Sequence, residues 1–389
     1  MVPNSISKLD LVQAQISEIP EDWQLCKVSE ALRIRNNFRK PISQEVRETM
    51  KGQYPYYGPT KIQDYISEYE QDGIYALIGE DGDHFLKYAT MPQTQFISGK
   101  CTVNNHAHIL ESSSICDSEW FFNYFKHRNI TNFLSRQGAG RFKLNKATLE
   151  KLPLLVPPLP EQRKIAQILS TWDRGIATTE KLIDASKQQK KALMQQLLTG
   201  KKRLIDPETG KAFEGEWENT HLSNIASIKK GKALSAKNLV AGSYPVIAGG
   251  KSSPYSHVDF THENVITVSA SGAYAGYVSY HPYKIWASDC SVVTAKPANY
   301  LGFIFQWLQL NQIRIYSMQS GGAQPHIYPK DLEVMKLRVP KVEEQEKIAS
   351  VLTAADEEIK FLEAKLAYFK QEKKALMQQL LTGKRRVKV

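Results

Sequence analysis

The sequence is poor in cysteine, with four in 389 residues and no Cys-x-x-Cys pair. The four lie far apart along the chain, at Cys26, Cys101, Cys116 and Cys290. Such scattered positions argue against a disulfide-stapled scaffold and against a cysteine-based zinc site. We therefore expect reduced, buried thiols in a cytoplasmic protein.

Long apolar segments are also missing. The N-terminal sequence MVPNSISKLD has no apolar core of the kind that a signal peptide needs. The longest apolar-rich stretch, 301–310, is interrupted by Gln306 and Gln309 and is too short to span a bilayer. These absences predict a soluble protein without membrane contact.

The chain lacks the short motifs that accompany nucleotide and methyl-transfer chemistry. It has no Gly-rich phosphate loop of the GxxxxGK[ST] or GxGxxG kind. Its Pro157-Pro158 pair lies in VPPLPEQ, without the Asn or Asp and the aromatic residue that flank such a pair in enzymes that methylate amino groups. His106 and His108 share one face of an expected strand, but no third metal ligand lies at a convincing spacing. We therefore predict no catalytic residue, no metal ligand and no cofactor of its own in this chain.

Hydrophobic residues (42%) and aromatic residues (10%) are plentiful enough to form globular cores. Lys and Arg number 51 against 40 Asp and Glu, a net charge of +11. Both globular regions share the excess, with 17 basic against 14 acidic residues over 23–158 and 11 against 6 over 217–340. A basic surface favours a polyanionic partner such as nucleic acid.

An internal repeat organises the chain. The string KKALMQQLLTGK occurs at 190–201 and again, unchanged, 183 residues later at 373–384. At the same offset Glu161-Gln162 matches Glu344-Gln345, and each half opens with a tryptophan (Trp23, Trp217) and contains a Tyr-Pro pair (54–55, 244–245). The sequence is therefore a tandem duplication, in which a divergent globular part precedes a well-matched tail.

Each tail has the apolar periodicity of a helical seam, with alternating steps of four and three residues. Pro157, Pro158 and Pro160 precede the first tail and Pro340 the second, while Gly200 and Gly383 mark their ends. The apolar positions of the two seams are Ile165, Leu169, Trp172, Ile176, Ile183, Leu193 and Leu197, and Ile348, Leu352, Ile359, Leu362, Leu366, Phe369, Leu376 and Leu380.

The two helices are expected to pair with each other, although each could instead pack on its own domain. The first seam has polar positions at Thr179, Ser186 and Lys190, and a pairing in which Leu362, Leu366 and Phe369 compensate for them favours a two-helix coiled coil. Chain connectivity makes that pair antiparallel, with the two globular parts at opposite ends of a rod roughly 60 Å long.

The predicted fold class is α+β, with two tandem pseudo-repeats that each contain an α/β globular domain followed by a long helix. Strands are expected at 73–78, 107–110, 264–269 and 291–295, and helices at 119–126 and 301–310. The predicted divisions are a first domain at 1–158, a first helix at 159–201, a linker at 202–216, a second domain at 217–340, a second helix at 341–384 and a basic tail at 385–389.

Basic residues cluster at the same distance after the tryptophan in each half. Arg and Asn are the side chains that read guanine and adenine through two hydrogen bonds, while Lys mostly binds phosphate. A solvated charged loop is the alternative for any one of these residues. The candidates are Arg33, Arg35, Asn36, Asn37, Arg39 and Lys40 in the first half, and Lys229, Lys230, Lys232 and Lys251 in the second.

A polar, Gly-rich loop before each tail is a second candidate DNA-contacting surface, because glycines let the backbone approach a ligand closely. A simple turn is the alternative. The candidates here are Arg136, Gln137 and Arg141 in one half and Gln319, Gln324 and His326 in the other. Asn104-Asn105-His106 and the matching Ser288-Asp289-Cys290 are weaker candidates, with strand-edge packing as the alternative.

The sequence resembles the specificity subunit of type I restriction–modification systems. The resemblance is carried by VPPLPEQRKIAQIL at 156–169, by VPKVEEQEKIASVL at 339–352 and by the duplicated KKALMQQLLTGK, and it covers nearly the whole chain. The second copy departs from the pattern with Val-Glu-Glu-Gln in place of Leu-Pro-Glu-Gln.

The resemblance implies two target-recognition domains that each read one half of an asymmetric, bipartite site in double-stranded DNA. It implies docking of two modification (methyltransferase) subunits and of restriction (translocase and nuclease) subunits, which would bring S-adenosylmethionine, ATP and Mg²⁺. The chain itself would be non-catalytic. Two other functions stay open, a coiled-coil adaptor that binds no DNA and the specificity part of a type IIG-like enzyme.

Overall fold

The computed structural model describes residues 6–137, 141–251, 254–321 and 324–389. The chain divides into two compact units, residues 1–178 with 367–389 and residues 179–366. Both long helices, α6 (Leu159–Leu197) and α11 (Val342–Leu380), therefore contribute one part to each unit. Among the described residues, no helix is long and apolar enough to cross a membrane.

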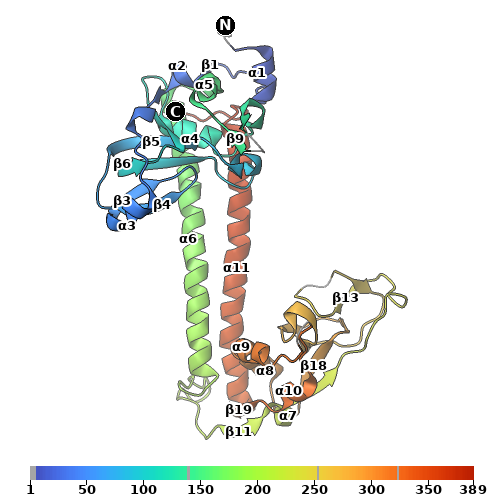
Figure 1. Ribbon diagram of the computed structural model, residues 1–389. Coiled ribbons are helices and arrows are strands. Elements are labelled where there is room, and N and C mark those ends of the chain that lie inside the picture. The colour runs from blue at the N-terminus through green and yellow to red at the C-terminus, as the bar shows by residue number, and fades with distance from the viewer. Residues whose placement is uncertain (1–5, 138–140, 252–253, 322–323) are drawn as a thin grey trace. The chain divides into compact units, whose positions relative to one another are not determined.

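The first unit is built on a six-stranded mixed sheet in the order β2-β7-β5-β6-β3-β4 (Figure 1). Helix α4 packs on β5 and β6 and buries Trp120, Phe121, Tyr124 and Phe125 against the sheet. The strands are β2 (Arg33–Ile34), β3 (Lys51–Tyr57), β4 (Ile62–Ile66), β5 (Gln71–Gly79), β6 (Thr94–Val103) and β7 (Ala107–Glu111). The helical segments are α1 (Lys8–Gln13), α2 (Val28–Ala31), η1 (Asn36–Phe38), α3 (Gln44–Thr49), η2 (Asp83–Lys87), α4 (Ser118–Phe125), η3 (Thr131–Phe133) and α5 (Lys146–Lys151).

Two antiparallel strand pairs complete this unit. β1 (Gln24–Lys27) pairs with β10 (Pro153–Val156), and β8 (Ser135–Gln137) pairs with β9 (Arg141–Lys143). The first pair joins the two ends of the domain's chain and leads directly into α6.

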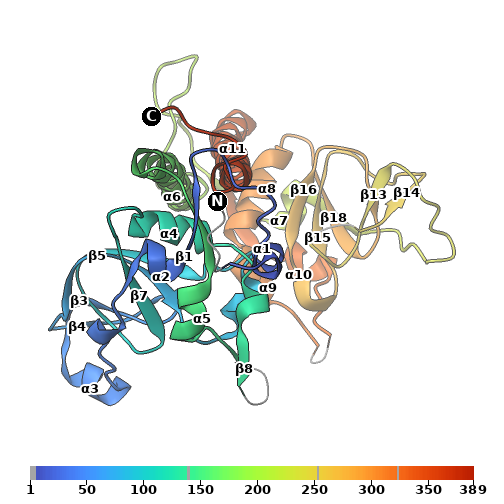
Figure 2. The ribbon, with the colours of Figure 1, turned by 90° about the horizontal axis from the view of Figure 1, so that it is seen from above.

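The second unit repeats this plan with shorter strands. A four-stranded sheet has the order β12-β18-β15-β16, helix α8 packs on it, and a smaller sheet has the order β14-β13-β17 (Figure 2). The strands are β11 (Glu218–His221), β12 (Ala226–Lys230), β13 (Tyr244–Ile247), β14 (Ser256–His257), β15 (Val265–Ser269), β16 (Val278–His281), β17 (Trp286–Ala287), β18 (Cys290–Ala295) and β19 (Lys336–Val339). The helices are α7 (Leu222–Ile225), η4 (Gly272–Tyr274), α8 (Leu301–Leu310), α9 (Gln312–Ser317) and α10 (Pro329–Glu333).

The α+β class and the predicted strands and helices are confirmed, and both Tyr-Pro pairs occupy the same topological position. Each lies in a strand, β3 or β13, that pairs antiparallel with the next strand and parallel with a later one. All four cysteines are free and buried. Burial raises the pKa of Cys101 and Cys290 to about 12 and holds both as thiols at neutral pH.

Within each unit the two long helices run antiparallel as a coiled coil. Every predicted apolar seam position is buried or half-buried, whereas residues on the outer faces are mostly exposed. Gly200 and Gly383 adopt left-handed φ angles of 71° and 70° just after the helices, the conformation in which glycine favours helix termination.

The polar part of the seam differs from the prediction. Lys190 does not face the apolar residues of α11, because its ammonium group donates to Asp356 at 2.6 Å. Phe369 packs edge-to-face on Trp172 instead, at 5.6 Å between ring centroids. In the first unit Lys373 donates to Asp173, and both residues lie 183 positions from the members of the other pair. Carboxylates at matched positions thus compensate the charges of the half-buried Lys190 and the buried Lys373.

The Glu-Gln motif at the start of each long helix attaches the helix to its unit. The Gln162 side chain donates to Pro157 O and accepts from Asp117 N–H, and Gln345 makes the same pair of contacts with Pro340 and Tyr300. Arg386 forms a bidentate ion pair with Glu161, and Arg203 forms the corresponding pair with Glu344.

Candidate nucleic-acid interface

Three segments meet where β5 ends and β7 begins in the first unit's main sheet. They are the turn after β5, the residues that enter β7, and the segment 142–144 that follows the β8–β9 hairpin turn. Backbone N–H groups join them, from Glu80 to His106 O (2.8 Å), from Leu144 to Glu80 O (2.7 Å) and from Gly82 to Phe142 O (3.3 Å).

The second unit joins the corresponding segments by the same three bonds. The N–H of Ala270 donates to Asp289 O (3.1 Å), that of Ile327 to Ala270 O (2.9 Å) and that of Gly272 to Pro325 O (3.1 Å). We call this shared arrangement the three-segment frame. Within each unit the frame joins the residues at the end of the Gly-rich loop to the segment 104–106 or 288–290 that the sequence singled out.

The side chains on the frame differ between the units. In the first, His106 Nδ1 lies 3.2 Å from Asp81 Oδ1, and the imidazole is about half exposed. In the second, the equivalent positions are Asp289 and Ser271, and the Ser271 hydroxyl donates to the exposed Asp289 carboxylate. A common backbone therefore presents different hydrogen-bonding groups at one place.

Most cations of the first basic cluster are neutralised within their own unit. Arg35 forms an ion pair with Glu111 at 2.7 Å, Arg39 one with Glu80 at 2.6 Å, and Lys40 one with Glu70. Burial opposes ionisation of Glu80, but the hydrogen bond from Arg39 and the adjacent positive charges prevail and lower its pKa. These three basic residues support the fold as much as they offer charge to a ligand.

The other candidates of the first cluster vary in accessibility. Arg33 keeps 62% of its side chain exposed and lies 3.8 Å from Glu111, and Asn37 is exposed. The side chain of Asn36 makes a hydrogen bond within the unit, because its amide nitrogen lies 2.9 Å from His108 Nδ1.

Of the first Gly-rich loop, Arg136 is exposed, and its guanidinium lies 5.1 Å from the centre of the Phe142 ring. Residues 138–140 and the side chains of Gln137 and Arg141 lie outside the described residues.

Lysines of the second unit contact aromatic rings. Lys232 lies over Trp286 at 5.1 Å, and Lys251 lies over Tyr274 at 5.1 Å. Lys229, Lys230, Lys232 and Lys251 are exposed, and no carboxylate lies within ion-pair distance of them in the described part of the chain. A cation on an aromatic face keeps its net charge, so these residues remain available to phosphate.

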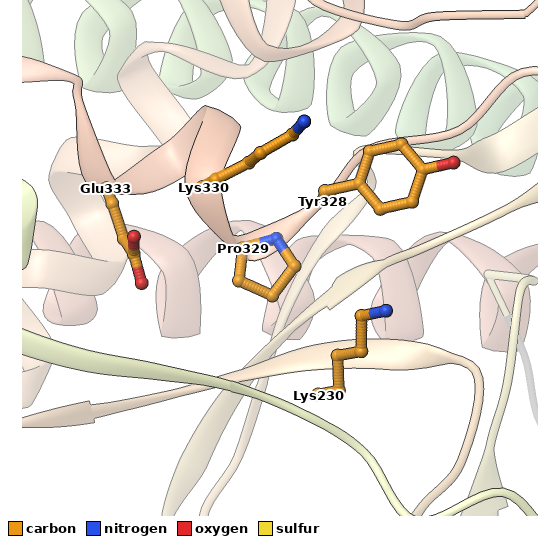
Figure 3. A pocket seen from close by; sticks show the side chains of 5 residues that line it. All are labelled: Lys230, Tyr328, Pro329, Lys330 and Glu333. Atoms are coloured by element: carbon orange, nitrogen blue, oxygen red, sulfur yellow. The ribbon is translucent and has the colours of Figure 1, made fainter.

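A shallow pocket of about 440 Å³ forms beside this surface (Figure 3). Lys230 and Lys330 lie 5.8 and 5.6 Å from the Tyr328 ring centre, and Glu333 lies on the far side of Pro329. The pocket therefore places two ammonium groups around one aromatic ring. Tyr328 and Lys330 follow the candidate loop directly and were not predicted, because nothing in the sequence shows that α10 packs beside β12.

Two side chains of the second Gly-rich loop make contacts within their own unit. The Gln319 amide donates to Ala275 O at 2.8 Å, and the His326 ring stacks on Tyr328 at 6.0 Å. Gln324 is exposed, while Gly322 and Ala323 lie outside the described residues.

The two histidines considered as metal ligands have different environments. His108 is buried in β7, and its Nε2 lies 2.7 Å from Leu144 O. Burial lowers its pKa, which keeps the imidazole neutral at physiological pH. Over the described residues, no group of three or more His, Cys, Asp or Glu side chains is placed to hold a metal ion.

The chain consists of two copies of one recognition-type domain, each followed by half of an antiparallel coiled coil. The family model of the type I restriction modification DNA specificity domain matches residues 20–188 and again residues 214–370. The chain belongs to this family. It is a type I restriction–modification specificity subunit with two specificity domains.

Curated relatives resemble the chain over most of their length. A putative type I restriction enzyme specificity subunit of Haemophilus influenzae is 26% identical and covers 85% of this chain and 86% of its own. The putative MjaX specificity subunit of Methanocaldococcus jannaschii is 27% identical, with coverages of 97% and 96%.

Solved structures share the fold. The crystal structure of the type I restriction–modification S subunit from M. genitalium aligns with a TM-score of 0.70 at 15% identity and covers 94% of this chain and 96% of its own. A chain from a study of complex assembly in a type I restriction–modification system aligns with a TM-score of 0.52 at 14% identity, with coverages of 94% and 98%.

Proposed function

We propose that the chain reads an asymmetric, bipartite site in double-stranded DNA, with one half-site for each specificity domain. The observation that carries this proposal is the three-segment frame, which recurs with the same backbone bonds and different side chains. Two domains with the same backbone arrangement but different side chains toward the DNA bases recognise two different sequences. The unpaired lysines of the second unit supply the charge that binding to phosphate requires.

The long helices carry the second part of the proposal, which is the docking of two identical modification subunits. The repeated twelve-residue string has the same exposed residues in both copies, namely Lys191, Ala192, Gln195 and Gln196, and Lys374, Ala375, Gln378 and Gln379. Recognition domains diverged while these outer faces stayed identical, and two identical faces suit two copies of one partner. Restriction subunits join the same assembly.

All catalysis in this proposal belongs to the partners. S-adenosylmethionine lies on the modification subunits, which flip and methylate the target base, and ATP and Mg²⁺ lie on the restriction subunits. This chain contributes sequence recognition and spacing. The purified chain alone is expected to transfer no radiolabelled methyl group to DNA, and transfer would overturn this part of the proposal.

The decisive experiment is methylome sequencing of cells that express this chain with its modification subunit. We expect methylation at one motif made of two different half-sites with an unread gap between them. A control strain expresses the modification subunit without this chain. A motif that is continuous, palindromic or unchanged in the control would contradict the proposal. Purified chain that binds its partners but shows no sequence preference on DNA would identify it as a coiled-coil adaptor.

A further inference from the structure

The Ser271–Asp289 pair holds an open carboxylate acceptor at the centre of the second unit's three-segment frame. Ser271 lies two residues beyond the end of β15, and Asp289 lies one residue before β18. Both are fixed by the backbone, because Ala270 donates to Asp289 O and Ser271 forms a bridge with His326. The Ser271 hydroxyl donates to one oxygen of Asp289, and the other oxygen has no hydrogen-bond partner among the described residues.

A close glycine contact leaves room around this carboxylate. A Cβ atom on Gly249 would lie 2.8 Å from Ser271 O and 3.2 Å from Asp289 Oδ2. Any larger side chain would therefore have to displace the backbone or cover the carboxylate. This contact explains why position 249 of the Gly-Gly-Lys sequence at 249–251 is a glycine. The sequence matches no phosphate-loop pattern.

The charge around the pair decides which ligand it suits. The Lys251 ammonium group lies over the ring of Tyr274, three residues after Ser271. No carboxylate forms an ion pair with this lysine in the described part of the chain. Lysines of this kind attract the DNA backbone, whereas a carboxylate repels phosphate. An exposed Asp on such a surface is placed for a hydrogen-bond donor, and the donors on the major-groove edge of DNA are the amino groups of cytosine and adenine.

The first unit has a different pair on the same frame. Asp81 occupies the position of Ser271, and His106 that of Asp289. The Asp81 carboxylate orients the imidazole through Nδ1, which leaves Nε2 as the outward group. If these side chains only closed the turn, the same residue types would be expected in both units. Positions that contact different DNA bases are instead expected to differ in residue type.

We infer that Asp289, positioned by Ser271, is a specificity-determining residue that accepts a hydrogen bond from a base amino group in the half-site of the second domain. This inference rests on the proposed function. Cytosine N4 and adenine N6 share the donor chemistry, and the experiment separates them. The Asp81–His106 pair has the corresponding place in the first domain.

The test uses the assembled modification complex and a library of DNA duplexes in which both half-sites are randomised. Asp289→Asn keeps the shape of the side chain and replaces one acceptor with a donor. We expect preference for an amino-bearing base to fall about tenfold at one base pair of the second half-site, with a shift toward a keto-bearing base. The first half-site should stay unchanged, and the base preferred by the unsubstituted complex identifies cytosine or adenine.

Two further variants separate base reading from charge and folding. Glu263→Gln removes a negative charge from an exposed position of the same unit and should alter no base preference. Ser271→Ala releases Asp289 and should weaken the preference for the same base. If Asp289→Asn lowers stability or affinity without changing preference at any single base pair, the inference is wrong and the pair only closes the turn. A complex without sequence preference before substitution would instead refute the proposed function.

Discussion

Individual cations of the two specificity domains are held by different partners. Arg35 and Arg39 lie against carboxylates of their own unit, whereas Lys232 and Lys251 lie on aromatic rings. Each such ion pair cancels one positive charge, and removal of one partner would leave the other charge buried and uncompensated. A lysine on a tyrosine or tryptophan keeps its charge. The second domain also has fewer acidic residues, 6 against 11 basic ones, where the first has 14 against 17.

Buried histidine at position 281 makes the second unit sensitive to acid. His281 Nε2 lies 2.9 Å from Thr267 Oγ1, and burial lowers its pKa to about 4, whereas an unfolded histidine titrates near 6.5. A lowered pKa in the folded state means that the unfolded chain binds the proton first as the pH falls. The stabilisation is therefore complete above about pH 6.5 and is lost between pH 6.5 and 4.

We expect His281→Gln to lose less stability than the unsubstituted protein between pH 7.5 and pH 4.5, because glutamine can bond Thr267 without being protonated. Urea unfolding at the two pH values measures the difference. His221→Gln, at an exposed position of β11, is the control and should follow the unsubstituted protein. Equal acid losses in all three proteins would show that His281 has no part in the transition.

At the scale of elements, the antiparallel pairing of α6 and α11 is fixed by two equivalent ion pairs. Lys190 keeps 13% of its side chain exposed and Asp356 keeps 29%, and Asp356 also accepts from Gln306 at 2.9 Å. Leaving one partially buried charge without its partner costs more than an exposed ion pair contributes. These pairs therefore specify register as well as stability.

Charge exchange tests this register. Lys190→Asp alone places two carboxylates together and should destabilise the second unit by about 3 kcal/mol. Adding Asp356→Lys should recover most of that loss, and a double-mutant cycle measured by chemical denaturation gives the coupling energy. The exposed pair Lys187–Glu363 is the matched control, and its reversal should change stability by less than about 1 kcal/mol. Absence of recovery in the double variant would contradict the register.

For the whole molecule, the duplication predicts that a fragment ending near Arg203 forms a symmetric dimer. Asp173 and Lys190 are the equivalents of Asp356 and Lys373, so each helix of the dimer would offer Lys190 to Asp173 of the other copy. One contact that is lost is that of Trp172 with Phe369, because Ser186 is the equivalent of Phe369. The fragment is therefore expected to dimerise, less tightly than the two helices of the full chain pair.

Ser186→Phe should tighten that dimer about tenfold or more, because two symmetry-related edge-to-face contacts between Trp172 and Phe would form, at about 0.5–1.5 kcal/mol each. Sedimentation equilibrium measures the dissociation constant. Ala185→Phe adds the same ring to an exposed position and should leave the constant unchanged. With the modification subunit, the dimer should select a palindromic site. A fragment that stays monomeric, or a tighter dimer only for the Ala185 variant, would refute this arrangement.

The proposed spacing role of the helices gives another prediction for the whole molecule. Inserting seven residues after Ala185 and seven after Tyr368 keeps the 3.5-residue seam in register and leaves both ion pairs in place. The coiled coil should lengthen by about 10 Å, equivalent to about three base pairs. We expect a longer gap between unchanged half-sites, with a smaller increment where DNA distortion compensates for the altered rotation. Methylome sequencing of the insertion variant checks this, since an unchanged gap would exclude spacing by the helices and altered half-sites would exclude modular reading.

The sequence alone determined the duplicated α+β plan, the two long helices and their seams. These features depend on short-range periodicity, on Pro and Gly at helix ends, and on identity at one offset, all of which are visible without coordinates. The buried thiols were predicted from the scattered positions of the cysteines, and the family from the repeated motifs. The candidate surface was located in outline, since the residues that end each Gly-rich loop are joined, through the turn after β5 or β15, to the segment before β7 or β18.

Only the tertiary structure decided which partner each polar side chain has. Glu111 follows Arg35 by 76 residues and Asp356 follows Lys190 by 166, and no local pattern marks either pair. The sequence does not indicate the frame, because Ser271 follows β15, Asp289 precedes β18, and the two match Asp81 and His106 at different sequence offsets. Hydrogen bonds and ion pairs act only at contact distance. In the two domains the order of the strands brings such residues together, across loops whose lengths differ between the copies. This order, unlike helical periodicity, is not visible in the sequence.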